Sequence, residues 1–309
     1  MAINKNLVYY HSLEDLSVLS LNDNFNFLKQ KNGLVYNLGD AFFYPPNYLK
    51  NNLSFALVFS ENSMKRDIPS GSVWHFKEDK YRQEILKDDV GCGMSLFLTP
   101  KDIPADDWMG VLRNKSIGGG NHFLNTGSFD DEVDYMLLHA DLNKEGSVPK
   151  TIDEAKDFVH IASQRRQELA YDIFQELGVN GYIFKDWPHN SVDEDEFGVS
   201  YLKGVVDSKK TGGVGLIGLN PHDGAFLTMQ LSNKLNGYMQ HGLGVKNHEF
   251  KKFYQKDSID SNMQYIVKEN SCEDVCNSFN SVSSLLQRFC PESFYVDRQL
   301  KPDLTFKLR

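Results

Sequence analysis

Apolar residues recur at helical spacing through one long stretch of the chain, residues 151–178. Thr151 and Glu154 have the spacing of a capping box at its start, and Gly178 is placed to end it. The recurring apolar positions are Phe158, Ile161, Leu169, Ile173, Phe174 and Leu177. A period near 3.6 residues, sustained over this length, predicts one amphipathic helix.

Continuous apolar runs lie on both sides of this helix, at residues 133–141 and 181–190. Such runs are typical of strands, so the order strand, helix, strand predicts a crossover unit with both strands in one sheet. Further strands are expected at 213–219, 224–231 and 304–309, and a helical tail at 272–289. The pattern therefore predicts a fold of mixed strands and helices, of the α/β or α+β class.

No repeat, low-complexity tract or Pro/Ser-rich linker divides the 309 residues, so we expect one domain, residues 1–309. Residues 1–60 indicate short mixed elements with a break at 44–47, and we find no chemistry in them. Hydrophobic residues at 40% and charged residues at 24% are ordinary for a soluble protein. The net charge of −9 argues against a surface that binds polyanions indiscriminately. A nucleic acid would need a local basic pocket or a bound cation.

Four cysteines in a chain of this length do not form a disulfide framework, which favours a reducing compartment. The first residues contain no continuous apolar segment, and no run of eighteen apolar residues occurs anywhere. We therefore expect a cytoplasmic protein with no membrane partner.

Metal-ligating side chains stand at the ends of predicted elements and in glycine-rich turns. His139 and His189 close two predicted strands, His122 follows three glycines, and Cys92 lies between two glycines just after Asp89. Taken singly, each has a structural explanation as a capped or turn residue. Together they form the Asp/Cys/His set that binds a borderline divalent metal. Spacing alone does not establish that these distant residues meet in space.

The same residues fall in four short motifs that occur in a fixed order along the chain. The motifs are DVGCGM at 89–94, GGGNHF at 118–123, HN at 189–190 and HGLG at 241–244. In this order they resemble the signatures of RtcB-type RNA ligases. The resemblance runs from about residue 85 to the C-terminus and is strong only within these motifs, while residues 1–80 match weakly. It implies one catalytic domain around a central mixed sheet flanked by helices, with a di-metal cleft at strand ends.

The resemblance implies a pair of Mn²⁺ ions. Asp89, Cys92 and His122 match the ligands of the first ion. Cys92 bridges to the second ion, whose other ligands match His139 and His189. A thiolate that contacts two cations gains from flanking glycines, because bare backbone approaches closely. Two metals suit displacement at phosphorus, where one orients the nucleophile and the other offsets charge.

His241 matches the histidine that, in such ligases, attacks the α-phosphate of GTP and carries GMP as a phosphoramidate. The GMP passes to an RNA 3′-phosphate, and a 5′-hydroxyl displaces it to seal the strand. A neutral imidazole has a lone pair available for this step, since its unperturbed pKa is about 6.5. Asp67 is a weaker candidate for the group that orients His241.

Further residues match nucleotide and RNA contacts of the family. Asn121 is implied at the nucleotide phosphates, and Asn125 and Lys307 at the guanine. Lys307, two positions before Arg309, has the alternative of a solvated surface charge. Lys203, before a glycine, and Lys246 are implied along the RNA path. The implied partners are broken RNA ends, from tRNA or cleaved RNA, and an archease-like activator.

Three departures from the family pattern keep other functions open. Asn125 replaces a glutamate that contacts guanine, so base selectivity is expected to weaken. An arginine is missing after His139, and another is replaced after His241 by Val245, with Lys246 next. The alternatives are a di-metal RNA end phosphoesterase that has lost guanylylation, and a non-catalytic RNA-binding relative.

Other cysteines and histidines have simpler explanations. Cys272 and Cys276 are one helical turn apart, but no further ligand stands at matching spacing, which favours half-buried helix residues. His222, in the sequence LNPHDG, is favoured as a turn residue, with a place near the nucleotide as its alternative. His160 lies within the long helix and is expected to be structural or at the surface.

Overall fold

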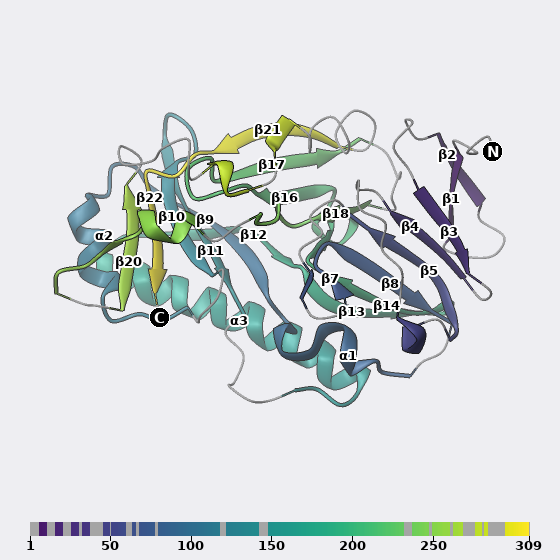
Figure 1. The fold of residues 1–309 in the computed structure, drawn as a ribbon. Coiled ribbons are helices and arrows are strands. Elements are labelled where there is room, and N and C mark those ends of the chain that lie inside the picture. The colour runs from purple at the N-terminus through teal and green to yellow at the C-terminus, as the bar shows by residue number, and fades with distance from the viewer. Residues whose placement is uncertain are drawn as a thin grey trace.

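A computed structural model places most of the chain. It describes residues 6–10, 16–20, 26–30, 33–37, 46–49, 51–59, 64–65, 68–77, 80–117, 122–141, 148–231, 237–246, 249–259, 262–267, 276–279, 281–283 and 294–308. Two large sheets and several small ones dominate this part of the chain, with one long helix beside them (Figure 1).

The largest sheet has seven strands in the order β12-β9-β11-β10-β22-β20-β19. Its strands are β9 (Gly93–Pro100), β10 (Phe123–Ser128), β11 (Val133–Ala140), β12 (Tyr182–Pro188), β19 (Gln255–Lys256), β20 (Met263–Val267) and β22 (Leu304–Leu308). Every neighbouring pair in it is antiparallel. The central sheet is therefore not the mixed sheet that the family resemblance implied.

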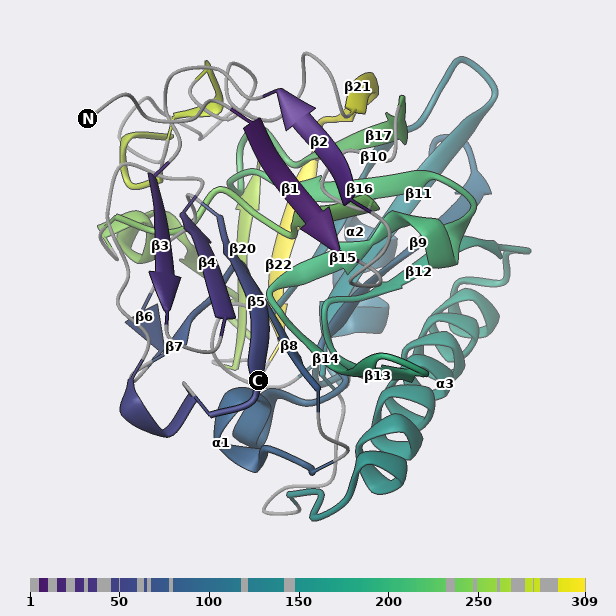
Figure 2. The ribbon, with the colours of Figure 1, turned by 90° about the vertical axis from the view of Figure 1, so that its right-hand side faces the viewer.

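A second sheet has six strands in the order β13-β14-β8-β5-β4-β3, seen from its side in Figure 2. They are β3 (Asn26–Gln30), β4 (Gly33–Asn37), β5 (Leu53–Val58), β8 (Ser72–Phe76), β13 (Asn190–Asp195) and β14 (Gly198–Lys203). Within the described residues, β4 with β5 is the only parallel strand pair. The fold is thus α+β with mainly antiparallel sheets.

Smaller sheets complete the described strands. They are β1 (Asn6–Tyr10) with β2 (Leu16–Ser20), β6 (Met64–Lys65) with β7 (Ile68–Pro69), β15 (Val205–Asp207) with β18 (Tyr238–Gln240), and the three-stranded set β16 (Val214–Gly218), β17 (Ala225–Gln230) and β21 (Phe294–Leu300). The predicted strands at 213–219, 224–231 and 304–309 are therefore confirmed as β16, β17 and β22. Most of the predicted helical tail lies outside the described residues.

The residues that the structure describes contain three α-helices beside the sheets: α1 (Gln83–Leu86), α2 (Ala105–Leu112) and α3 (Ile152–Leu177). Short 3-10 turns are η1 (Asn47–Leu49), η2 (Lys87–Asp89), η3 (Ser208–Thr211) and η5 (Glu249–Phe253). In the described part of the chain, no helix combines the length and apolar character needed to cross a membrane.

The predicted crossover is confirmed with one difference. β11 and β12, on either side of α3, belong to the same sheet, and both run antiparallel to β9 between them. They are consequently parallel to each other but not adjacent. α3 itself begins as predicted, because the Thr151 hydroxyl accepts a hydrogen bond from the Glu154 N–H at 3.1 Å. It ends at Gly178, whose φ of 68° is left-handed.

The seven-stranded sheet is buried on both faces, as the alternation along β11 makes clear. Met136 and Leu138 pack with residues of α2 and α3, whereas Tyr135 and Leu137 pack in a cluster shared with the six-stranded and three-stranded sheets. Side chains two residues apart share a face of a strand, so His139 lies on the face turned away from α3. Burial on both faces explains why this strand has a continuous apolar sequence.

Candidate metal centre

Four predicted ligands stand at the same end of four neighbouring strands. Cys92 directly precedes β9, and His139 is the penultimate residue of β11, paired with Met94. His189 directly follows β12, and His122 directly precedes β10. In an antiparallel sheet the start of one strand and the end of its neighbour share an edge. The alternation of strand direction therefore gathers residues that are nearly a hundred positions apart.

The side chains meet at close range. The Cys92 sulfur lies 3.3 Å from His139 Nε2 and 3.5 Å from His122 Nε2. His139 Nε2 in turn lies 3.3 Å from His189 Nε2. The sulfur is therefore close both to His122, predicted as a ligand of the first ion, and to His139, predicted as a ligand of the second. Cys92 and His139 are 6% exposed, and His189 is 2% exposed.

Ligand atoms of these residues form two overlapping groups, in each of which all atoms lie within 4.8 Å of one another. One group is Cys92, His122 and His139, and the other is His139, His189 and His241. Thiolate and imidazole are the donors that borderline divalent metals take, so this set fits a metal centre. His139 belongs to both groups, and His241, the predicted nucleophile, belongs to the second.

The predicted ligand Asp89 is not in either group. It ends η2, where its backbone carbonyl accepts a hydrogen bond from the Cys92 N–H at 3.1 Å. Among the described groups of three ligand atoms within 4.8 Å, none includes its carboxylate. The structure therefore brings together Cys92 and three histidines, while Asp89 contributes a backbone contact that shapes the turn before Cys92.

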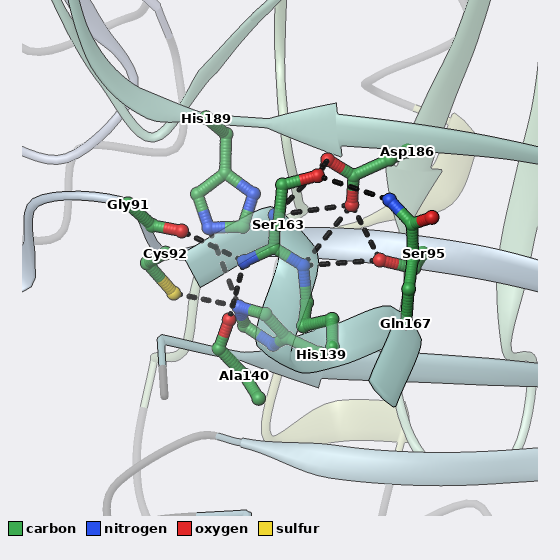
Figure 3. Close-up of polar contacts among 10 residues, drawn as sticks. Gly91, Cys92, Ser95, His139, Ala140, Ser163, Gln167, Asp186 and His189 are labelled. Carbon is green, nitrogen blue, oxygen red and sulfur yellow. Dashed lines mark hydrogen bonds and ion pairs between the residues drawn. The ribbon is translucent and has the colours of Figure 1, made fainter. Parts of the chain in front are cut away.

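A buried guanidinium fixes the strand ends that carry the ligands. Arg166 of α3 is fully buried, and its Nη1 donates to the carbonyl oxygens of Gly91 at 2.8 Å and Ala140 at 3.0 Å. Its Nε and Nη2 donate to the Asp186 carboxylate at 3.0 and 3.1 Å. Figure 3 shows Gly91, Ala140 and Asp186 beside Cys92, His139 and His189. Gly91 and Ala140 adjoin Cys92 and His139, and Asp186 lies three residues before His189 on β12, so Arg166 joins the chain segments that carry three ligands.

The glycines around Cys92 also have structural roles that the sequence did not indicate. Gly91 has a φ of 88°, in the left-handed region that glycine adopts most readily. A Cβ on Gly93 would lie 2.6 Å from Nη2 of Arg166. Gly91 therefore turns the chain, and Gly93 leaves room for the guanidinium.

Backbone contacts orient His241. Its Nδ1 lies 2.9 Å from the Gly204 carbonyl oxygen, which also accepts the His241 N–H at 3.0 Å. A carbonyl only accepts, so Nδ1 carries the hydrogen and the Nε2 lone pair is left for chemistry. The ring centroid lies 4.2 Å from that of His189. Asp67, the other candidate for orienting His241, lies outside the described residues.

A pocket with a cavity volume of about 110 Å³ adjoins the histidines. His139, His241, Asn125 and Lys307 line it, together with apolar and backbone groups. Its other lining residues include Met94, Phe123, Leu219, Asn220, Leu243, Val245, Tyr254, Phe279 and Thr305. Its lining, mainly apolar with a few polar groups, is typical of small-molecule sites.

Two predicted nucleotide contacts are buried in this pocket. Asn125 is 2% exposed, and within the described part of the chain its Oδ1 has no hydrogen-bond partner. Lys307 is 7% exposed on β22, with its ammonium 5.5 Å from the centre of the Tyr254 ring. The alternative of a solvated surface charge for Lys307 is therefore wrong. Burial raises the pKa of Tyr254 above its usual value, so the phenol stays protonated.

The remaining predicted contacts are placed differently. Lys203 is 5% exposed, and its ammonium donates to the Ile85 carbonyl oxygen at 2.7 Å. This burial argues against a contact between Lys203 and an RNA phosphate, because the ammonium is enclosed by protein. Lys246 is exposed next to Val245 at the pocket. Asn121 lies outside the described residues.

Sequence reasoning missed Arg166, although a signal was present. Arg166 continues the line of buried positions Ala162, Ala170 and Ile173 on α3, where a charge is unexpected. By contrast Ile161, predicted for the apolar face, is 40% exposed. An arginine in phase with small buried residues indicates a guanidinium that is paired inside the protein.

The arrangement provides a thiolate, four imidazoles and a pocket with buried amide and ammonium groups at one end of a sheet. No protein-family model and no curated protein matches this chain.

Proposed function

We propose that this chain is a GTP- and Mn²⁺-dependent RNA ligase of the RtcB type. It joins RNA 3′-phosphate or 2′,3′-cyclic phosphate ends to 5′-hydroxyl ends. One observation carries the proposal: Cys92, His122, His139 and His189, all predicted as ligands, converge with His241 from five separate segments. The adjoining pocket is lined by Asn125 and Lys307, as a nucleotide site there would require.

In this proposal Cys92, His122, His139 and His189 hold the metal ions. When bound, Mn²⁺ supplies positive charge to phosphoryl oxygens and lowers the barrier to displacement at phosphorus. Arg166 keeps the ligand-bearing strand ends in register. The buried amide of Asn125 and the ammonium of Lys307 bind and orient the nucleotide in the pocket.

His241 performs the covalent step. Its Nε2 attacks the α-phosphorus of GTP, a nitrogen–phosphorus bond forms, and the bond to the pyrophosphate oxygen breaks, so pyrophosphate leaves with the electron pair. The Gly204 carbonyl, 2.9 Å from Nδ1, stabilises the positive charge that develops on the ring. An oxygen of the RNA 3′-phosphate then attacks the GMP phosphorus and releases His241. Finally the 5′-hydroxyl attacks the RNA phosphorus, its proton passes to solvent, and GMP leaves.

One observation favours a second function, a di-metal RNA end phosphoesterase. The ligand atom of His241 lies within 4.8 Å of those of His139 and His189, so His241 has the position of a third metal ligand. A histidine occupied as a ligand has no lone pair for attack on GTP. This function retains the metals and opens cyclic phosphates by attack of water, without a covalent nucleotide.

Labelling with GTP separates the two functions. Incubation with α-labelled GTP and Mn²⁺ should leave label on the protein that acid removes and alkali does not, as expected of a histidine phosphoramidate. His241→Ala should abolish the label. His160→Ala, which removes an exposed histidine of α3, is the matched control and should retain it.

Strand joining is then measured with RNA ends that bear a 3′-phosphate and a 5′-hydroxyl. Label together with joining supports the ligase. Absence of label, with opening of a 2′,3′-cyclic phosphate retained, overturns the ligase in favour of the phosphoesterase. Absence of both activities overturns both functions and leaves a metal-binding protein.

A further inference from the structure

A second group of metal-ligating side chains lies away from the strand ends that carry Cys92. His222 and Asp223 belong to the turn between β16 and β17, and Cys276 lies in a short helical turn. The ligand atoms of these three residues all lie within 4.8 Å of one another. Two chain segments more than fifty residues apart thus bring a thiol, an imidazole and a carboxylate together.

The distances within this group agree with a tetrahedral ion. The Cys276 sulfur lies 3.8 Å from His222 Nδ1 and 3.6 Å from Asp223 Oδ2, and Nδ1 lies 3.0 Å from Asp223 Oδ1. Around Zn²⁺, with its usual bond lengths and tetrahedral angles, sulfur would lie about 3.6 Å from nitrogen or oxygen, and nitrogen about 3.4 Å from oxygen. Small shifts of these half-buried side chains therefore suffice.

The arrangement does not suit a catalytic relay. In a Cys-His-Asp triad the thiol and the carboxylate contact opposite nitrogens of the imidazole. Here both face the same nitrogen, Nδ1 of His222. Three groups directed at a common point are what a metal ion requires.

The turn that carries His222 and Asp223 is held in shape before any ion binds. Asn220 Oδ1 accepts hydrogen bonds from the His222 N–H at 2.9 Å and the Asp223 N–H at 2.8 Å. Asn220 Nδ2 donates to Asp223 Oδ2 at 2.8 Å, which fixes the carboxylate. Ligands fixed by surrounding hydrogen bonds lose little entropy on binding.

The group adjoins the pocket described above. Asn220 and Pro221 line the pocket directly before His222, and Phe279 lines it three residues after Cys276. The Lys246 N–H donates to the carbonyl of Ser278, which ties the Cys276 segment to the chain that follows His241. An ion here would clip the β16–β17 turn to the segment that carries Phe279, so both would form one wall of the pocket.

We propose that His222 Nδ1, one Asp223 oxygen and Cys276 Sγ bind a single Zn²⁺ ion. Three protein ligands leave the fourth tetrahedral position for water or for an anionic group of a pocket ligand. The site differs in residues and position from the Cys92 centre and does not rest on the ligase proposal. Cys276 is half-buried in a helical turn and His222 lies in a turn, as predicted, and the proposal adds a ligand role to both.

Co²⁺ binds at zinc sites, and its complexes with thiolate ligands show a charge-transfer absorption band. Titration with Co²⁺ therefore tests the site. The metal-free full chain carrying Cys92→Ser is titrated with Co²⁺, so that the thiolate of the first centre does not contribute. A thiolate band should appear in this variant and should be lost when Cys276→Ser is added. Adding Cys290→Ser instead is the control and should leave the band. No band in Cys92→Ser, or a band that survives Cys276→Ser, overturns the proposal.

A second measurement uses the unaltered protein and is independent of how the serine variants fold. Alkylation of Cys276 is followed by mass spectrometry of its peptide with and without Zn²⁺. Zinc should slow modification of Cys276 at least tenfold, and His222→Ala should remove this protection. Equal rates with and without zinc in the unaltered protein, or full protection in His222→Ala, would rule the site out.

Discussion

Removing the Arg166 guanidinium is expected to destabilise the protein and loosen its metal centre together. Arg166→Met leaves a side chain of similar length that cannot donate. The change strips the charge partner from Asp186, whose side chain is 13% exposed, and removes the donor to the Gly91 and Ala140 carbonyls. Gly91 and Ala140 adjoin Cys92 and His139, and Asp186 lies three residues before His189. Loss of the guanidinium should therefore disturb the positions of all three ligands.

The magnitude follows from the burial of the pair. Breaking a buried ion pair by deleting one partner costs about 3–5 kcal/mol. Asp186 keeps hydrogen bonds from the hydroxyls of Ser95 and Ser163, which favours the lower end, about 3 kcal/mol. Proteins are stable by only about 5–15 kcal/mol, so the loss is a large share of the total.

Urea unfolding measures the effect. With slopes of about 1–3 kcal/mol per molar, the midpoint should fall by about 1 M or more. Mn²⁺ retained after dialysis should fall as well, and Arg166→Lys should lie between the two proteins, because an ammonium keeps the charge but not the fork of donors. Arg165→Met, at the partly exposed neighbouring position, is the control. An Arg166→Met midpoint no lower than that of Arg165→Met would refute this reasoning.

Two further changes test the centre itself. Cys92→Ala should deplete both Mn²⁺ ions, because the sulfur lies 3.5 Å from His122 Nε2 and 3.3 Å from His139 Nε2. Elemental analysis measures the metal content, and one ion retained would contradict a shared thiolate. Gly204→Ala should lower guanylylation at least tenfold with metal content unchanged, since its Cβ would lie 2.9 Å from Nδ1 of His241. Gly212→Ala is the control, because Gly212 has a similar φ of 70° and an added Cβ there would meet nothing within 4 Å. It therefore reports the effect of backbone strain alone. Equal labelling of the two variants would exclude displacement of His241 as the cause.

The local pattern of the sequence determined the elements and most of the candidate centre. The bounds of α3 followed from its cap, its period and Gly178, because capping and periodicity depend on residues a few positions apart. The strand ends at His139 and His189 followed from apolar runs, which are buried on both faces in β11 but partly exposed in the edge strand β12. The convergence of His122 with Cys92 was an inference from motif order, and its geometry came only with the antiparallel register.

Tertiary structure alone decided which polar groups are buried and which distant side chains meet. Arg166 is inside because Asp186 and two strand-end carbonyls complete its hydrogen bonds, and Lys203 is inside because Ile85 accepts from its ammonium. The meeting of Cys276 with His222 depends equally on how two loops pack. The free energy of burying a charge or placing a ligand is set by partners far away in the chain, and no local pattern carries that information.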